Sequence, residues 1–224
     1  MRSDIEGVAF DLDGTLYPNY RFNIKLIPFI LKEWRLLAAF GKARTIIRKE
    51  QKTSPPAKDG FYEYQAGITA KLLSADHAQL KEKIDRLIYK GWEPMFKTIK
   101  LYHHAKDTLT ALRKAGYKLG LLSDFPPEKK LEYLGLDGLW DAVLSSEQFG
   151  ALKPHPVSFT ELASAMSLPC EKILYVGNSR AYDVKGAKRT GMKTAWIKSP
   201  LSLGSGGADF SFSDYRQLCN FMLD

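Results

Sequence analysis

Two aspartates, Asp11 and Asp13, stand two residues apart in the stretch VAFDLDGTLYPN, between an apolar run and a Gly-Thr pair. Asp and Gly are common turn residues, so an acidic turn after a strand would explain this stretch without any chemistry. Two like charges at one strand end nevertheless repel each other, and a bound cation would relieve that repulsion. Polar residues elsewhere in the chain distinguish a purely structural turn from a cation-binding site.

Three further apolar runs, KLGLL, DAVL and ILYVG, also end in polar side chains. Because parallel strands bring their carboxyl ends to one edge of a sheet, where ligands bind, we expect these side chains to gather there with the aspartates. Carboxylates, a lysine, a hydroxyl and an amide suit a divalent cation with a phosphate, since Mg²⁺ prefers carboxylate, water and phosphate oxygens. The candidates are Ser123, Asp124, Ser145, Ser146, Lys153, Asn178, Ser179 and Asp183.

The elements that would position these residues are short apolar runs bounded by Gly, Asp or Ser. Helix-length segments at 156–167 and 181–191 separate the later runs. This alternation is typical of βαβ units, and near-continuous apolar runs suit strands that are covered on both faces. The sequence therefore predicts an α/β fold, a three-layer Rossmann-like core around a parallel sheet. Its strands are expected at 7–10, 118–123, 142–146, 173–178, 193–197 and 209–213.

A long segment from Tyr17 to about His104 contains no convincing strand. Ile24, Ile27, Leu31, Trp34 and Ala38 recur at intervals of three or four residues, as do Leu72, Leu80, Ile84, Leu87 and Ile88. This spacing predicts helices, inserted after the first strand and broken at Lys52–Gly60. We expect Trp34, Trp92 and Tyr62 to lie in the core of this insertion, with the alternative that any of them faces the substrate.

Composition limits the class of protein. The chain has 224 residues, 45% of them hydrophobic and 26% charged, which is typical of a soluble globular protein. No apolar run reaches the roughly 18 residues that a membrane span needs. The two cysteines, Cys170 and Cys219, form no CxxC pair, so we expect neither a zinc site nor a disulfide framework and place the protein in the cytoplasm.

Most of the net charge of +8 lies between Arg21 and Thr53, where nine basic residues face two acidic ones. The simplest explanation is a solvated basic helix face. The alternative is that some of these residues attract an anionic substrate or an acidic surface. The residues considered for that role are Lys25, Lys32, Arg35, Lys42 and Arg44.

Four motifs in order identify a family resemblance. DLDGTL (11–16), Ser123 after an apolar strand, Lys153-Pro154 and VGNSRAYD (176–183) resemble the motifs of the haloacid dehalogenase-like hydrolase superfamily. The resemblance covers roughly residues 4–20 and 105–224. It implies a core of residues 1–17 and 104–224, with residues 18–103 forming a helical cap that closes over the active site.

The resemblance also implies a role for each motif residue. Asp11 would attack phosphorus and form an aspartyl-phosphate, while Asp13 would serve as general acid and base. Lys153 would offset negative charge in the transition state. The phosphate-binding residues would be Ser123, Asp124, Lys153, Gly14 and Thr15, with backbone N–H groups of the Gly-Thr turn facing the phosphate. The ligands of a Mg²⁺ cofactor would be Asp11, Asp13, Asn178 and Asp183.

One residue, Asp13, bears on the branch of the family, and two others depart from its usual motifs. The dehalogenase branch lacks an acid at the position of Asp13, so its presence favours phosphate ester chemistry. Asn178 departs from the Gly-Asp that usually begins the last motif, and this loss of charge should weaken Mg²⁺ binding. Asp124 also departs, because Asn or Thr often follows the hydroxyl of the second motif.

The expected activity is Mg²⁺-dependent hydrolysis of a small phosphorylated metabolite, whose identity one sequence does not reveal. A phosphomutase with the same intermediate is an alternative. A low-activity binding protein that uses its basic cap for an anionic partner, either nucleic acid or membrane, is another. The intact set Asp11, Asp13, Ser123 and Lys153 argues against the binding protein and makes a nucleic-acid partner unlikely.

Overall fold

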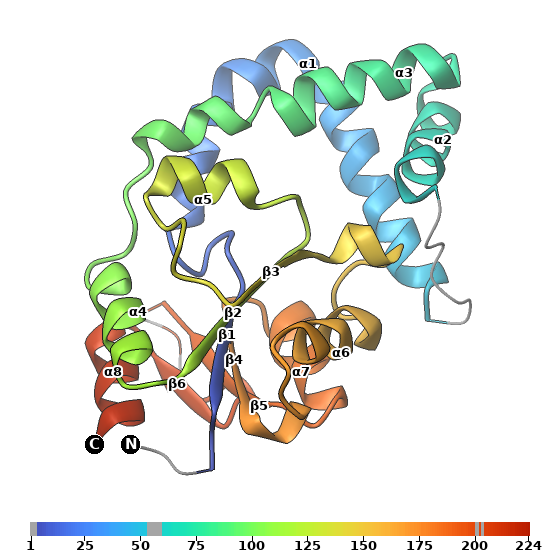
Figure 1. Ribbon diagram of the computed structural model, residues 1–224. Coiled ribbons are helices and arrows are strands. Elements are labelled where there is room, and N and C mark those ends of the chain that lie inside the picture. Colours follow the sequence, from blue (N-terminus) through green and yellow to red (C-terminus); the bar gives the residue numbers. More distant parts are fainter. Residues whose placement is uncertain (1–3, 53–59, 200–201, 203) are drawn as a thin grey trace.

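A six-stranded parallel sheet forms the centre of the computed structural model, which describes residues 4–52, 60–199, 202 and 204–224 (Figure 1). The strand order is β3-β2-β1-β4-β5-β6, so β1 lies between the strands that carry the later motifs. All six predicted strands are confirmed. They are β1 (Gly7–Phe10), β2 (Lys118–Ser123), β3 (Ala142–Ser145), β4 (Ile173–Gly177), β5 (Lys193–Ile197) and β6 (Phe210–Phe212).

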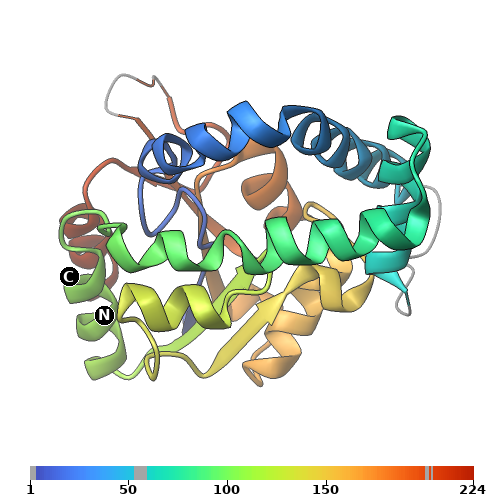
Figure 2. The same ribbon diagram turned by 90° about the horizontal axis from the view of Figure 1, so that it is seen from above.

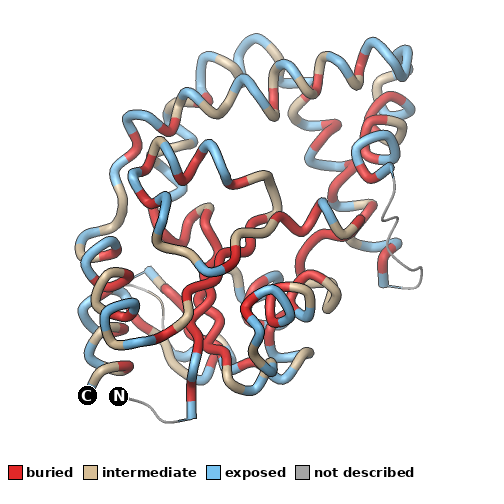
Figure 3. Tube along the Cα trace, in the orientation of Figure 1, coloured by how far each residue is buried: buried red, intermediate tan, exposed pale blue. Residues whose placement is uncertain are grey.

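Helices cover both faces of the sheet, as the three-layer prediction requires. Successive side chains of β1 alternate between two hydrophobic clusters: Val8 and Phe10 pack on one side and Ala9 on the other. The first cluster is completed by α4 (Ala105–Lys114), α5 (Glu128–Leu134) and α8 (Tyr215–Leu223). The second is completed by α6 (Pro156–Ala165) and α7 (Lys185–Arg189). Every residue of β1 is therefore buried (Figure 3).

The described part of the segment between β1 and α4 consists of helices joined by short turns and loops. It comprises α1 (Asn19–Glu50), α2 (Phe61–Leu73) and α3 (His77–Ile84), followed by a π-helical turn (Asp85–Lys90) and a 3-10 turn (Glu93–Thr98). These helices arch over the carboxyl edge of the sheet (Figures 1 and 2). Residues 53–59, within the predicted break at Lys52–Gly60, lie outside the described part. Among the described residues, no helix combines the length and the apolar character that crossing a membrane would need.

The prediction that Trp34 lies in the core of the insertion is wrong. Its side chain is 62% exposed, and Tyr62 is 37% exposed. Trp92, in contrast, packs against a hydrophobic cluster of the insertion that includes Phe40 and Ile88. The helix that contains Trp34, α1, instead buries Leu36 and Phe40. Both sides of α1 are apolar, so residue spacing identified a helix without showing which side faces inward.

Three side chains near the end of α1 connect the insertion to the sheet domain. Arg44 is buried and donates hydrogen bonds to Glu147, to Gln65 and to the carbonyl oxygen of Asp124. Arg48 donates to the Asp124 carboxylate at 2.5 Å and to the carbonyl oxygen of Lys153 at 3.0 Å. Gln51 exchanges two hydrogen bonds with the backbone of Leu152. Arg44 and Arg48 thus hold the insertion against the loops at the sheet edge.

We predict that Arg44→Met destabilises the protein by about 3–5 kcal/mol, because it leaves the buried Glu147 carboxylate without its cation. Lys42→Met, at an exposed position of the same helix, should change stability by less than about 0.5 kcal/mol. Urea denaturation at neutral pH measures both. Equal stability of the two variants would contradict a structural role for Arg44, and Arg44→Met/Glu147→Gln should recover part of the loss.

Candidate active site

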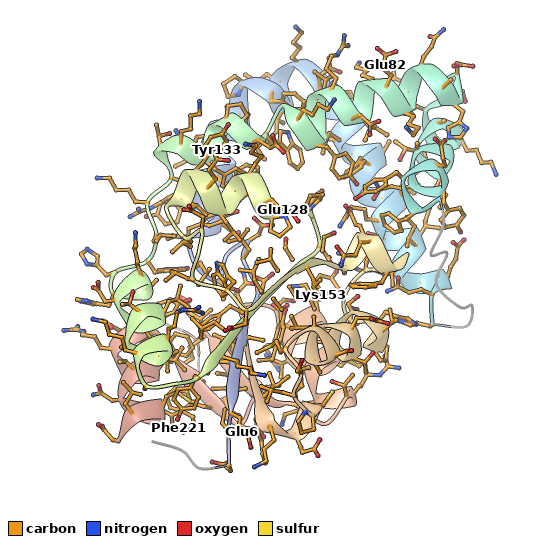
Figure 4. All side chains as sticks on the ribbon, viewed as in Figure 1. Glu6, Glu82, Glu128, Tyr133, Lys153 and Phe221 are labelled. Carbon is orange, nitrogen blue, oxygen red and sulfur yellow. The ribbon has the colours of Figure 1, made fainter. Side chains whose placement is uncertain are left out.

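A buried lysine joins two carboxylates at the carboxyl edge of the sheet. Lys153 Nζ donates to Asp11 Oδ1 at 2.6 Å and to Asp183 Oδ1 at 2.7 Å. Asp11 follows β1 and Asp183 follows β4, whereas Lys153 lies in the loop after β3. Figure 4 places Lys153 between the sheet and the helical insertion. The neighbouring strands β1 and β4 and the loop after β3 therefore bring these three residues together, although they are far apart in the sequence.

Burial raises the pKa of Asp11 to about 7. The charge of Lys153 lowers this pKa, whereas the negative charges of Asp183 and Asp13 raise it. Burial disfavours the charge of Lys153, but Asp11 and Asp183 outweigh it and raise the pKa of the ammonium. Lys153 therefore stays charged, while the anionic form of Asp11 would gain from any further positive charge placed beside it.

The turn after Asp11 orients its carboxylate. Thr15 Oγ1 donates to Asp11 Oδ2 at 2.6 Å, while the Thr15 N–H donates to the carbonyl oxygen of Leu12 at 3.2 Å. That N–H is thus engaged within the turn, which differs from the expectation that it faces a phosphate. Gly14 has φ +87°, and a Cβ there would lie 2.0 Å from Nδ2 of Asn178. Glycine is needed at this position both for the backbone conformation and for the approach of Asn178.

Asp13 has two partners that the sequence did not suggest. Lys130, from α5, donates to both carboxylate oxygens at 2.8 and 3.0 Å, and the hydroxyl of Tyr17 donates to Oδ1. Ser123 Oγ donates to Oδ2 at 3.4 Å. Burial would raise the pKa of Asp13, but the charge and hydrogen bonds of Lys130, together with Tyr17, lower it below its usual value. Asp13 is therefore held as a carboxylate, next to an Asp11 whose pKa is raised.

Lys130 could not be singled out from the sequence because Lys129 precedes it and both carry the same charge. Burial distinguishes them: the side chain of Lys130 is 9% exposed and that of Lys129 is 57% exposed. The Lys130 ammonium lies over the rings of Phe96 and Phe125, at 5.1 and 5.2 Å from their centroids. These contacts fix the position of its charge.

Asp124 has a different environment from the phosphate contact that was expected. Its carboxylate accepts hydrogen bonds from Arg48, from Ser146 Oγ at 2.5 Å and from the backbone N–H of Lys153 at 2.9 Å. Burial would raise its pKa, but Arg48, Lys153 and Arg44 outweigh that effect and lower the pKa to about 2. Asp124 still lines the pocket, but these donors occupy its carboxylate and connect it to the Lys153 backbone and to Arg48 of the insertion. Ser145 caps the turn after β3 and does not line the pocket.

A pocket of about 170 Å³ contains most of the candidate residues. Gly177 lets Asp183 approach, since a Cβ at Gly177 would lie 2.3 Å from the Cβ of Asp183. The other oxygen of Asp183 accepts from the Ser179 N–H at 2.8 Å. The lining residues are Asp11, Asp13, Asp124, Phe125, Lys153, Asn178, Ser179, Tyr182 and Asp183.

The oxygen donors in this pocket suit a hard divalent cation. The carboxylates of Asp11 and Asp183, the side-chain oxygen of Asn178 and the carbonyl oxygen of Asp13 could hold Mg²⁺. Within the described part of the chain, no three His, Cys, Asp or Glu side chains form a ready-made metal cage. Mg²⁺ commonly uses one or two carboxylates with waters and phosphate oxygens, so this sparse set fits it.

Sequence comparisons place this site among known hydrolases. The family model described as haloacid dehalogenase-like hydrolase matches residues 5–191. The chain is 30% identical over 227 residues to a phosphoglycolate phosphatase of Escherichia coli (strain K12), covering 90% of this chain and 84% of that relative. It is 29% identical over 210 residues to a glyceraldehyde 3-phosphate phosphatase of Methanopyrus kandleri, covering 87% and 84%. The match to the Pyrococcus abyssi protein named glyceraldehyde 3-phosphate phosphatase is 37% over 97 residues and spans only 41% of that relative.

Solved structures share the fold over nearly the whole chain. A HAD phosphatase from Thermococcus onnurineus has a TM-score of 0.66 at 24% identity, covering 98% of each chain. A putative HAD-hydrolase from Bacillus subtilis, bound to magnesium, has a TM-score of 0.69 at 17% identity, covering 98% of this chain and 99% of that one. A dehalogenase has a TM-score of 0.69 at 16% identity, covering all of both chains. At these identities the likeness concerns the fold alone.

Proposed function

We propose that this chain, which belongs to the haloacid dehalogenase-like hydrolases, is a Mg²⁺-dependent phosphatase that hydrolyses a small phosphorylated metabolite through an aspartyl-phosphate at Asp11. The observation that carries the proposal is the convergence of Asp11, Asp13, Lys153 and Asp183 on one pocket. Asp13 supports phosphate ester chemistry over dehalogenation, because an alkoxide leaving group needs a proton and a halide does not.

In this mechanism one oxygen of Asp11 attacks phosphorus while the bond from phosphorus to the ester oxygen breaks. Asp13 gives its proton to the leaving oxygen. Asp13 then takes a proton from the water that attacks the aspartyl-phosphate, which releases inorganic phosphate and restores Asp11. Asp13 must therefore be protonated when the ester binds, although Lys130 lowers its pKa in the free protein.

The residues around Asp11 favour its attack. Thr15 and Lys153 each hold one carboxylate oxygen, which fixes the orientation of Asp11. The charge of Lys153 offsets the negative charge that Asp11 and the phosphoryl group bring together. Bound Mg²⁺ would supply further positive charge to Asp11 and the phosphate oxygens. The buried hydroxyl of Ser123 donates to Asp13 Oδ2 at 3.4 Å and would bind a phosphoryl oxygen once Asp13 turns to the substrate.

The names of the relatives and the size of the pocket suggest the first substrates to test. Two relatives are named as phosphatases of phosphoglycolate and of glyceraldehyde 3-phosphate. A space of about 170 Å³ suits a phosphate with a short organic part. Residues 18–103 would form the cap that excludes water during the reaction. A cytoplasmic location is part of this proposal.

The test is hydrolysis of an aryl phosphate, 2-phosphoglycolate and glyceraldehyde 3-phosphate, with Mg²⁺ and with chelator. We expect turnover that requires Mg²⁺ and falls by at least about a thousandfold in Asp11→Asn. Asp137→Asn, an exposed aspartate in the same domain, serves as the control and should retain full activity. Turnover by Asp11→Asn at the wild-type rate would refute the proposed nucleophile, and no turnover across a broad panel of phosphate esters would refute the phosphatase.

Lys130 sets the pH range in which Asp13 can donate a proton. Because Lys130 lowers the pKa of Asp13, Lys130→Met should raise it and extend the protonated form to higher pH. The basic limb of the kcat/KM profile should therefore move to higher pH in Lys130→Met and stay near wild type in Lys130→Arg. Lys129→Met, at the exposed neighbour, is the matched control. A basic limb that is the same in Lys130→Met and Lys129→Met would exclude this role.

A further inference from the structure

The first half of α1 presents apolar side chains to solvent. Leu31 is 78% exposed, Ile24 is 59% exposed and Ile27 is 51% exposed. Tyr20 continues the same row at intervals of four, three and four residues, and the row ends before the kink in α1 at Glu33. Such spacing places them along one side of a helix. Figure 3 shows this part of α1 as largely exposed at the crest of the molecule, facing away from the sheet.

This exposed row is not the side by which α1 packs on the rest of the protein. Phe22 and Phe29 face inward, where both contact Trp92 and Phe22 also stacks on Phe96. The helix is thus apolar on two opposite sides, and only the side with Phe22 and Phe29 packs against other described residues. A helix that is apolar nearly all round is normally buried, so the outward row calls for a partner.

Basic residues border the apolar row. Arg21, Lys25 and Lys32 each follow an apolar position by one residue, which places them about 100° round the helix from it. Arg35, just beyond the kink at Glu33, is exposed, as is Lys32. No acidic residue occurs from Asn19 to Lys32, and the first one after it, Glu33, pairs with Lys83 at 2.7 Å. Within the part of the chain that the structure describes, the row therefore lies beside positive charge that forms no ion pair.

We propose that this face of α1, formed by Tyr20, Ile24, Ile27 and Leu31 with Lys25, Lys32 and Arg35 at its border, binds the surface of an anionic membrane. Apolar side chains would enter the boundary between headgroups and acyl chains, while the basic side chains would contact anionic headgroups. Tyr20 suits that boundary, because it combines an apolar ring with a polar group.

The charges favour a membrane over a second copy of the chain or a nucleic acid. Two copies meeting through this face would bring Lys25, Lys32 and Arg35 of both together without acidic partners. A nucleic acid would pair with the basic border but would leave the apolar row in contact with its phosphates and water. The neighbouring helical segment from His77 to Thr98 is also net positive, with five basic and three acidic residues. An anionic lipid surface can bury the apolar row and also pair with the basic residues at its border.

The test is co-sedimentation of the full chain with vesicles of equal parts phosphatidylglycerol and phosphatidylcholine, and with vesicles of phosphatidylcholine alone. We expect binding to the anionic vesicles that weakens with added salt, and much weaker binding to the neutral ones. Each removed basic charge should lower the partition coefficient about fivefold, so Lys32→Gln/Arg35→Gln should lower it about 25-fold. Ile24→Ser/Leu31→Ser should also abolish most of the binding.

The control is Lys71→Gln/Leu72→Ser, which changes an exposed basic and an exposed apolar residue on α2 and should bind like wild type. Ile30 and Trp34 are left unchanged because they also line a cavity of about 610 Å³ that reaches Phe125 beside the active site. Hydrolysis of a soluble aryl phosphate should be the same in all variants, which confirms that each has folded and separates this proposal from the proposed function.

Three results would overturn the inference. The first is wild-type protein that does not sediment with the anionic vesicles. The second is Ile24→Ser/Leu31→Ser binding as tightly as wild type. The third is a wild-type dimer, seen by light scattering, that the same two substitutions convert to a monomer, which would assign the face to a second copy of the chain.

Discussion

The ammonium of Lys153 lies between two carboxylates, Asp11 and Asp183, that would otherwise repel each other in a buried site. The surrounding fold is arranged to make this contact. The sheet order places β1 beside β4, so Asp11 and Asp183 emerge at neighbouring strand ends, and the loop after β3 brings Lys153 between them. Since the pKa of Asp11 is raised to about 7 despite Lys153, the site gains from further positive charge. That property connects the geometry to the proposed Mg²⁺ and phosphate.

The same network extends into the helical insertion. Asp124 contacts the backbone N–H of Lys153 and the guanidinium of Arg48, so one carboxylate joins the proposed catalytic lysine to α1. Arg44 adds a buried contact to Glu147. These arginines belong to the basic stretch for which we considered an anionic substrate or an acidic surface as partner. In the structure they instead pair with acidic residues of the sheet domain. Lys32 and Arg35 of the same stretch, which form no ion pair with any described residue, lie near the middle of α1, where its exposed apolar row ends.

Much of the fold was predictable because its signals are local. Buried parallel strands appear as continuous apolar runs, and ordered motifs at their ends indicated which side chains would meet. The partners of those side chains depend on tertiary contacts instead. Lys130 resembles Lys129 in sequence and differs only in burial, and the acidic partners of Arg44 lie 80 and 103 residues away. The orientation of α1 was not predictable because both of its sides are apolar, which is why Trp34 was wrongly expected in the core.

The proposed mechanism requires that Asp11 becomes covalently phosphorylated during turnover. Mass spectrometry of peptides from protein quenched in acid during steady-state hydrolysis would detect this intermediate. We expect a peptide containing Asp11 that carries the mass of one phosphoryl group, and the loss of that species in Asp11→Asn. Steady-state hydrolysis with no phosphorylated peptide at any quench time, or with the phosphoryl group on another residue, would contradict it.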